Sequence, residues 1–207
     1  MRKTILVFLI AAGAAYGQYK AEPAGAPPAG LAASVAGKLE KDGAQIVSAD
    51  GAVFCEIWFT AAAPSGPKSA EESVSLPNIP HGALLGAIRF PSKAADRRGQ
   101  GIKPGVYTLR YSNYPVNGDH QGAAPQRDFA VLTPAADDQD GAATPNFETL
   151  MKMSRKASGT PHPSVLSIWK VDDFSASFAK QGENDWVLQK KVGDVPLAII
   201  LIGKAES

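Results

Sequence analysis

Hydrophobic and polar residues alternate with the two-residue period of a β-strand along much of this chain. The clearest case is residues 106–113, where Tyr107, Leu109 and Tyr111 share one side and polar residues share the other. Residues 195–203 are instead continuously apolar, which predicts a central strand that is buried on both faces. The pattern therefore predicts a protein built mainly from strands.

Turn residues separate the predicted strands. Asp50 and Gly51 join the predicted strands 44–48 and 53–60 as a hairpin, because glycine accepts the positive φ that a tight turn demands. Residues 61–80 are rich in proline and predict a long loop. Further strands are predicted at residues 83–90, 128–133, 164–169, 174–179 and 185–190.

One helix is predicted before the last group of strands. Thr144 is placed to cap it, and Pro145 suits the first helical position. Apolar residues recur at helical spacing from Phe147 onward, and Gly159 is typical of a helix end. Many short strands, frequent turns and a single helix favour one antiparallel β-sandwich of about eight strands, of the transthyretin or immunoglobulin type.

The N-terminus has the pattern of a secretory signal peptide over residues 1–17. Arg2 and Lys3 precede an apolar stretch at residues 5–12, and small residues follow up to Gly17. This stretch is shorter than the roughly 20 residues that a membrane-spanning helix needs. We therefore expect cleavage, export to the periplasm or the medium, and no membrane anchor on the mature protein.

The mature chain divides into a tail and one domain. Residues 18–30 are rich in proline, alanine and glycine and predict a flexible or extended tail, and residues 31–207 are long enough for one β-sandwich domain. Of the 21 Lys and Arg residues, two belong to the leader, which leaves 19 against 20 Asp and Glu. This balance gives no support for nucleic-acid binding.

Cys55 is the single cysteine, so no intramolecular disulfide can form. It alternates in phase with Val53, Ile57 and Phe59, which predicts a buried, inert thiol.

The candidate site combines two polar connections that contain histidine. One lies between predicted strands and the other, Pro-flanked, follows the helix. The candidate ligand-binding residues are Asp119, His120, Arg127, Asp128 and His162. His120 and His162 with a carboxylate could hold a transition metal or perform acid–base chemistry, and Arg127 could bind an anionic group.

A structural interpretation of the same residues stays open. Asp119 could hydrogen-bond within its own turn, and Arg127 or Arg110 could pair with Asp128 across the sheet. Neither His120 nor His162 lies in a spacing that defines a metal site alone. There is no phosphate-binding loop and no dinucleotide-binding motif, so we expect no nucleotide cofactor. Three tryptophans in predicted strands, Trp58, Trp169 and Trp186, could pack in the core or present a glycan-stacking face.

Several segments resemble an uncharacterised family of exported bacterial proteins. They are GAVFCEIWF, KPGVYTLRYSNYPVNGDHQGAAPQRDF, MSRKASGTPHPSVLSIW and VGDVPLAIILIGK. The PGVYTLRY part is also similar to turn-and-strand motifs of transthyretin-like sandwiches. The resemblance implies an exported β-rich domain and carries no activity or catalytic residue to this chain.

Three functions are compatible with these features. The first, which we favour, is a non-catalytic module of the cell envelope that binds a small ligand or a partner protein. The second is a metal-dependent enzyme that uses His120 and His162. The third is an interaction module for glycans or cell-envelope proteins.

Overall fold

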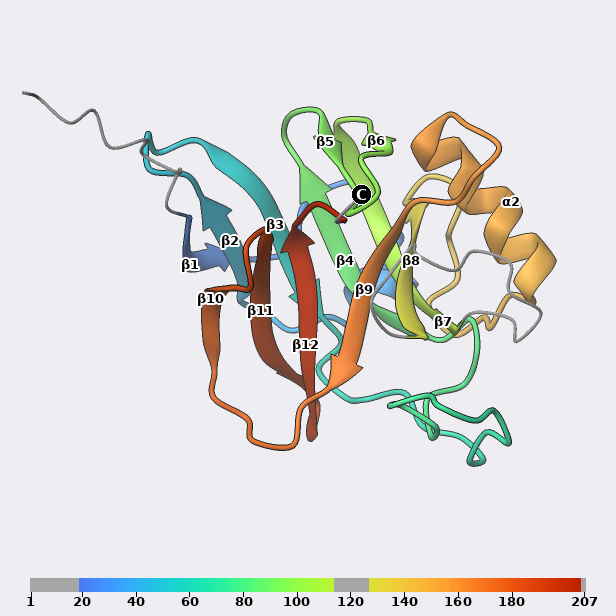
Figure 1. The fold of residues 1–207 in the computed structure, drawn as a ribbon. Helices are drawn as coiled ribbons and strands as arrows, with labels where there is room; N and C mark the ends of the chain where they lie inside the picture. Colours follow the sequence, from blue (N-terminus) through green and yellow to red (C-terminus); the bar gives the residue numbers. More distant parts are fainter. Residues whose placement is uncertain (1–18, 114–126, 206–207) are drawn as a thin grey trace, which may run out of the picture.

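The computed structural model of this chain describes residues 19–113 and 127–205, and Figure 1 shows how its elements are arranged. The strands are β1 (Lys20–Gly25), β2 (Gly43–Val47), β3 (Val53–Phe59), β4 (Leu84–Phe90), β5 (Ala94–Ala95), β6 (Gly101–Ile102), β7 (Gly105–Asn113), β8 (Asp128–Pro134), β9 (Val165–Lys170), β10 (Ser177–Gln181), β11 (Asp185–Val192) and β12 (Val195–Ile202). The helices are α1 (Ala33–Ala36) and α2 (Phe147–Ser158).

Ten of these strands form one continuous antiparallel sheet, in the order β1-β2-β3-β4-β7-β8-β9-β12-β11-β10. β5 and β6 form a small separate ribbon. The predicted two-sheet sandwich of the transthyretin or immunoglobulin type is therefore wrong. The difference arises at β8 and β9, which pair directly from Phe129–Ser167 to Val131–Val165 and so join what would be two sheets.

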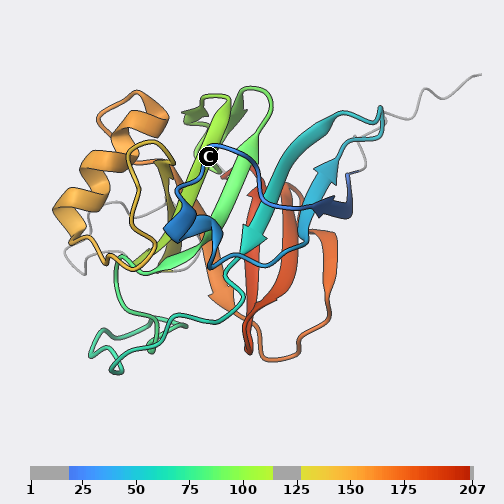
Figure 2. The same ribbon diagram turned by 180° about the vertical axis from the view of Figure 1, so that it is seen from behind.

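The sheet curls until its two edge strands approach each other, so that it is nearly closed into a barrel (Figures 1 and 2). At this seam the ring of Tyr19, just before β1, packs edge-on against Trp186 of β11, with centroids 5.5 Å apart. Trp186 in turn stacks on Phe178 of β10 at 5.4 Å. Among the residues that the structure describes, aromatic packing brings the edges together without a further ladder of hydrogen bonds.

The inward-facing residues of the strands fill the barrel. Tyr107, Leu109 and Tyr111 of β7 belong to this core, as the alternation of β7 predicts. Cys55 is also part of it, and burial raises the pKa of its thiol. The prediction of a buried, inert cysteine is thus confirmed as far as its burial is concerned.

Two segments cover parts of the outer surface of the sheet. α2 packs Leu150 and Met151 against Phe129, Val131 and Val165 of β8 and β9. The stretch around α1 covers the centre of β3 and β4, where Leu39 lies against Trp58 and Ala87. Polar residues on the outer side of β7 are consequently buried as well, which the alternation alone does not indicate.

Most local elements agree with the sequence. Gly51 adopts a φ of 85° in the predicted hairpin between β2 and β3. β12 is buried on both faces between β9 and β11. α2 ends at Gly159, with φ 69°, but its N-cap is Asn146, whose side chain accepts from the Thr149 amide, and not the predicted Thr144.

The N-terminal part of the predicted tail contributes to the sheet. β1 lies within residues 18–30 and pairs with β2, and Pro23 is tolerated there because β1 is an edge strand. Over residues 19–113 and 127–205, no helix has the length and apolar character needed to span a membrane.

Candidate functional site

Arg127 and Asp128 are two of the predicted ligand-binding residues, and both bind the loop of residues 61–80 of the same chain. The Asp128 carboxylate is buried and accepts hydrogen bonds from the Ser75 amide at 2.7 Å, the Leu76 amide at 3.2 Å and the Tyr111 hydroxyl at 2.7 Å. Burial, together with this carboxylate, raises the pKa of Tyr111. Arg127 pairs with the Glu71 carboxylate at 2.8 Å and donates to the Glu72 carbonyl.

These contacts define a clasp, which we call the 71–76 clasp, between the start of β8 and the loop of residues 61–80. The alternative pairing of Asp128 with Arg110 is wrong. Arg110 pairs instead with Asp138, and Asp128 is held by backbone amides and a phenol. The Asp128 carboxylate and the Arg127 guanidinium each contact residues that lie more than 50 positions away in the sequence.

His162 lies far from Asp128. Its side chain is exposed, and its backbone carbonyl accepts from Ser158 Oγ at 2.6 Å and Gln100 Nε2 at 3.1 Å. In the antiparallel β8–β9 ladder Val131 pairs with Val165, and His162 lies three residues before Val165. His162 is therefore near the C-terminal end of β8, whereas Asp128 is its first residue. At about 3.3 Å per residue, the length of β8 separates them by about 20 Å.

The structure therefore does not bring the described candidates into one site. Asp119 and His120 lie outside the described residues. Across residues 19–113 and 127–205, no three His, Cys, Asp or Glu side chains are grouped so that they could hold a metal ion.

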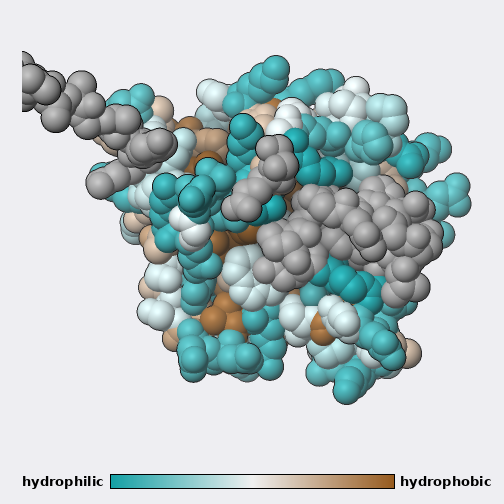
Figure 3. Space-filling view, in the orientation of Figure 1, coloured by the Kyte–Doolittle hydropathy of each residue, from teal (hydrophilic) through white to brown (hydrophobic). Residues whose placement is uncertain are grey.

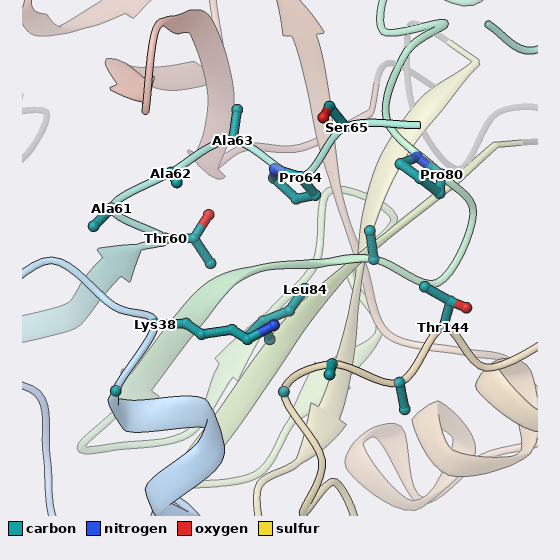
Figure 4. Close-up of a pocket in the computed structure, with 15 residues that line it drawn as sticks. Lys38, Thr60, Ala61, Ala62, Ala63, Pro64, Ser65, Pro80, Leu84 and Thr144 are labelled. Carbon is teal, nitrogen blue, oxygen red and sulfur yellow. The ribbon is translucent and has the colours of Figure 1, made fainter. Parts of the chain in front are cut away.

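A pocket of about 480 Å³ opens on another part of the molecule (Figure 4). It lies between the residues that follow α1, the end of β3, the start of β4 and the loop that precedes α2. Its lining consists of Gly37, Lys38, Thr60, Ala61, Ala62, Ala63, Pro64, Ser65, Pro80, Ala83, Leu84, Gly141, Ala142, Ala143 and Thr144. Short apolar side chains predominate in this lining.

Among the described residues that line the pocket, Lys38 is the only charged one. Figure 4 shows its side chain extended across the pocket toward Leu84. Its ammonium group makes no hydrogen bond or ion pair with any residue that the structure describes. The pocket therefore carries one positive charge that the described part of the protein leaves uncompensated.

Thr60 provides a second polar group without a partner. The residue is 5% exposed, and its hydroxyl is buried with no hydrogen bond among the described residues. Its backbone is fixed, because the amide donates to the Leu85 carbonyl at 2.9 Å. A buried hydroxyl without a partner is destabilising by about 1–3 kcal/mol, so native proteins rarely keep one without a reason.

Lys38 and Thr60 belong to the same end of the pocket. The Ala61 amide donates to the Lys38 carbonyl at 2.9 Å, and Leu39 forms a β-bridge with Thr60. These backbone contacts place the two side chains on adjacent segments, as Figure 4 also shows. We call this arrangement the Lys38–Thr60 pocket.

A buried arginine fixes the opposite wall of the Lys38–Thr60 pocket. Arg110 is fully buried and binds both carboxylate oxygens of Asp138, at 2.6 and 2.7 Å. Its remaining donors hold the carbonyls of Gly82, Asp140 and Ala143. The backbone of residues 140–143 is thus set by one rigid guanidinium, which makes the pocket a preformed one.

Close packing also positions this wall. Gly82 has a φ of 76°, and a Cβ there would come within 2.4 Å of the Pro145 carbonyl oxygen. On the other side, Ser34 Oγ donates to the Gln139 carbonyl at 2.7 Å and accepts from the Gly141 amide at 3.2 Å. These contacts lock the loop before α2 between β4 and α1.

Sequence reasoning missed the Lys38–Thr60 pocket because no motif marks it. Its lining comes from four separate stretches, and most of its apolar residues are alanines and prolines in predicted loops, whereas Ala83 and Leu84 belong to a predicted strand. The one available signal was Arg110, a charged residue in the most regular strand of the chain. Comparison of the chain with protein-family models, with curated proteins and with solved structures found no match.

Proposed function

We propose that this chain is an exported, non-catalytic binding protein of the cell envelope, and that its ligand is a small molecule bound in the Lys38–Thr60 pocket. The observation that carries the proposal is one preformed cavity whose lining includes an ammonium group, that of Lys38, and a buried hydroxyl, that of Thr60, for which the described residues provide no partner. Ligand pockets typically have volumes of about 300–1,000 Å³, mostly apolar walls and few polar groups, and this pocket has all three features.

The surface supports a small ligand over a partner protein. On the face in Figure 3, outside the grey residues, apolar residues form only small patches separated by hydrophilic ones. Among the described residues, Phe147 is the only large hydrophobic side chain that is exposed. Protein-docking surfaces generally show larger continuous apolar patches.

The tryptophans give little support to a glycan-binding face. Trp58 is buried and donates to the Gly25 carbonyl at 2.7 Å. Trp169 and Trp186 are half-buried and pack in different clusters, the first beside Ile200 and the second against Tyr19. A glycan would therefore meet two separate rings rather than one platform.

The proposal is tested by a ligand-observed NMR screen of small metabolites with two variants. Ala62 is exposed on the rim, so Ala62→Trp should fill the Lys38–Thr60 pocket without disturbing the core. Ala52 is an exposed residue near the opposite end of β3, and Ala52→Trp is the matched control. We expect compounds that bind the wild type and Ala52→Trp but not Ala62→Trp. Binding that is equal in all three proteins, or no binding by the wild type, would contradict the proposal.

A further inference from the structure

We infer that the ligand of the Lys38–Thr60 pocket is a small monocarboxylate with a compact apolar body. This inference rests on the proposed function and specifies the chemical class of the ligand. It is drawn from the charge of the pocket, the position of its two free polar groups and the character of the remaining walls.

The charge of the lining points to one negative charge on the ligand. Lys38 is the only charged residue among those that form the pocket, and the described residues provide no carboxylate to balance it. Lys38 is itself exposed, and a single anionic group bound against the apolar walls of the pocket would pair with its ammonium. A dianion would leave its second charge without a partner, and burying such a charge is unfavourable.

Thr60 indicates a group with two acceptor atoms. Its hydroxyl can donate a hydrogen bond, and the bridge between Leu39 and Thr60 puts its segment beside that of Lys38. The hydroxyl is buried in this structure, so a rotation about χ1 of Thr60 has to turn it toward a ligand in the pocket. A carboxylate has two oxygens, so one can face the ammonium of Lys38 while the other accepts from the Thr60 hydroxyl after this rotation. This arrangement would provide partners for both groups that the described residues leave unsatisfied.

The rest of the lining favours an apolar body. Ala61, Ala62, Pro64, Pro80 and Leu84 present short hydrophobic surfaces to the cavity. A sugar or another polyol would lose its hydration there and find few hydrogen-bonding partners in return. A short aliphatic or aromatic group would instead gain from burial of its own apolar area.

The inference is tested with 3-phenylpropanoate and its neutral amide, 3-phenylpropanamide. Dissociation constants are measured at neutral pH from shifts of the backbone amides of Ala61, Ala62, Ala142 and Ala143. The proteins compared are the wild type, Lys38→Met, Lys38→Arg and, as a matched control, Lys152→Met, at an exposed lysine of α2. We expect the acid to bind about tenfold more tightly than the amide in the wild type, Lys38→Arg and Lys152→Met. The ratio should fall to about one in Lys38→Met.

The outcomes separate this inference from the proposed function. If acid and amide bind the wild type equally well and Ala62→Trp abolishes both, the monocarboxylate inference is overturned while the pocket remains a ligand site. If the acid keeps its advantage in Lys38→Met, Lys38 is not its partner and the inference is also overturned. If neither compound shifts these amides, both the inference and the pocket proposal lose their support.

Discussion

Arg110 is more deeply buried, and holds more of the surrounding backbone, than its place in an alternating strand indicates. It lies on the outer side of β7 with Thr108 and Ser112, where a half-exposed sheet would meet water. The loop before α2 covers this side, so Arg110 and Asp138 form a fully buried ion pair. Thr108 and Thr133 also donate to Asp138, which leaves its carboxylate well supplied with partners.

Removing Arg110 should therefore destabilise the protein strongly. Arg110→Met leaves the charge of Asp138 buried without its cation, and we expect a loss of about 3–5 kcal/mol in the free energy of unfolding. Lys156→Met, which breaks the exposed pair with Asp137, should cost less than about 1 kcal/mol. Urea denaturation of the three proteins measures both values. Equal stabilities for the two variants would contradict the structural role of Arg110.

His81 lies just before β4 and is half-buried. Its Nδ1 lies 3.3 Å from Ser112 Oγ, its ring faces Phe147 at 6.0 Å, and its Nε2 is buried without a partner among the described residues. Burial lowers the pKa of His81 below its usual 6.5. Between these two pKa values the unfolded chain binds more protons than the folded one, so stability rises with pH in that window.

The pH dependence of stability should respond to His81. In the wild type the free energy of unfolding should fall as the pH drops below about 6.5 toward the lowered pKa. Part of this slope should disappear in His81→Gln. The full slope should persist in His162→Gln, because the side chain of His162 is exposed. Urea denaturation between about pH 5 and 7.5 provides the comparison. An unchanged slope in His81→Gln would show that another group is responsible.

At the scale of elements, local signals predicted where most strands lie but not what their ends contact. Asp50 and Gly51 marked the β2–β3 hairpin, and Gly159 marked the end of α2, because both turns depend on nearby residues only. Arg127 and Asp128 were recognised as chemically notable, yet their partners lie in the loop of residues 61–80. No local pattern contains that contact, so the sequence predicts a candidate binding site at the residues that form the 71–76 clasp.

Loosening the 71–76 clasp should release this loop. In Asp128→Asn an NH2 group replaces one carboxylate oxygen, and it cannot accept a hydrogen bond from the backbone N–H of Ser75 or Leu76. We expect a loss of about 1–3 kcal/mol in the free energy of unfolding. Hydrogen exchange at these two amides should accelerate by tenfold or more, whereas Glu71→Gln, at the exposed end of the Arg127 pair, should change it little. Exchange rates that stay the same in Asp128→Asn would exclude Asp128 as the anchor.

At the scale of the whole molecule, the alternation correctly assigned the inner and outer faces of β7 but not the closure of the sheet. In sandwiches and in barrels, inward-facing and outward-facing residues alternate along each strand, so the alternation alone does not distinguish the two architectures. Here the pairing of β8 with β9 and the contact of Tyr19 with Trp186 decide the architecture. The Lys38–Thr60 pocket arises from this closure and from the loops packed on it, so it could not be predicted from the sequence.

The metal-dependent alternative makes a prediction for the intact protein. If the chain is a binding protein without a metal centre, protein purified without an affinity tag should contain less than about 0.1 equivalent of Zn, Fe or Cu per chain, before and after refilling. Elemental analysis gives this number, with His120→Ala as the control. Stoichiometric metal that is lost in His120→Ala would favour the enzyme that uses His120 and His162.

A crystal structure of the full chain with 3-phenylpropanoate would show whether a small carboxylate binds in the Lys38–Thr60 pocket. We expect the carboxylate against the Lys38 ammonium, the Thr60 hydroxyl turned toward it, and the phenyl ring over Pro64 and Leu84. An empty pocket with the ligand bound beside His162 or Arg127 would contradict this expectation.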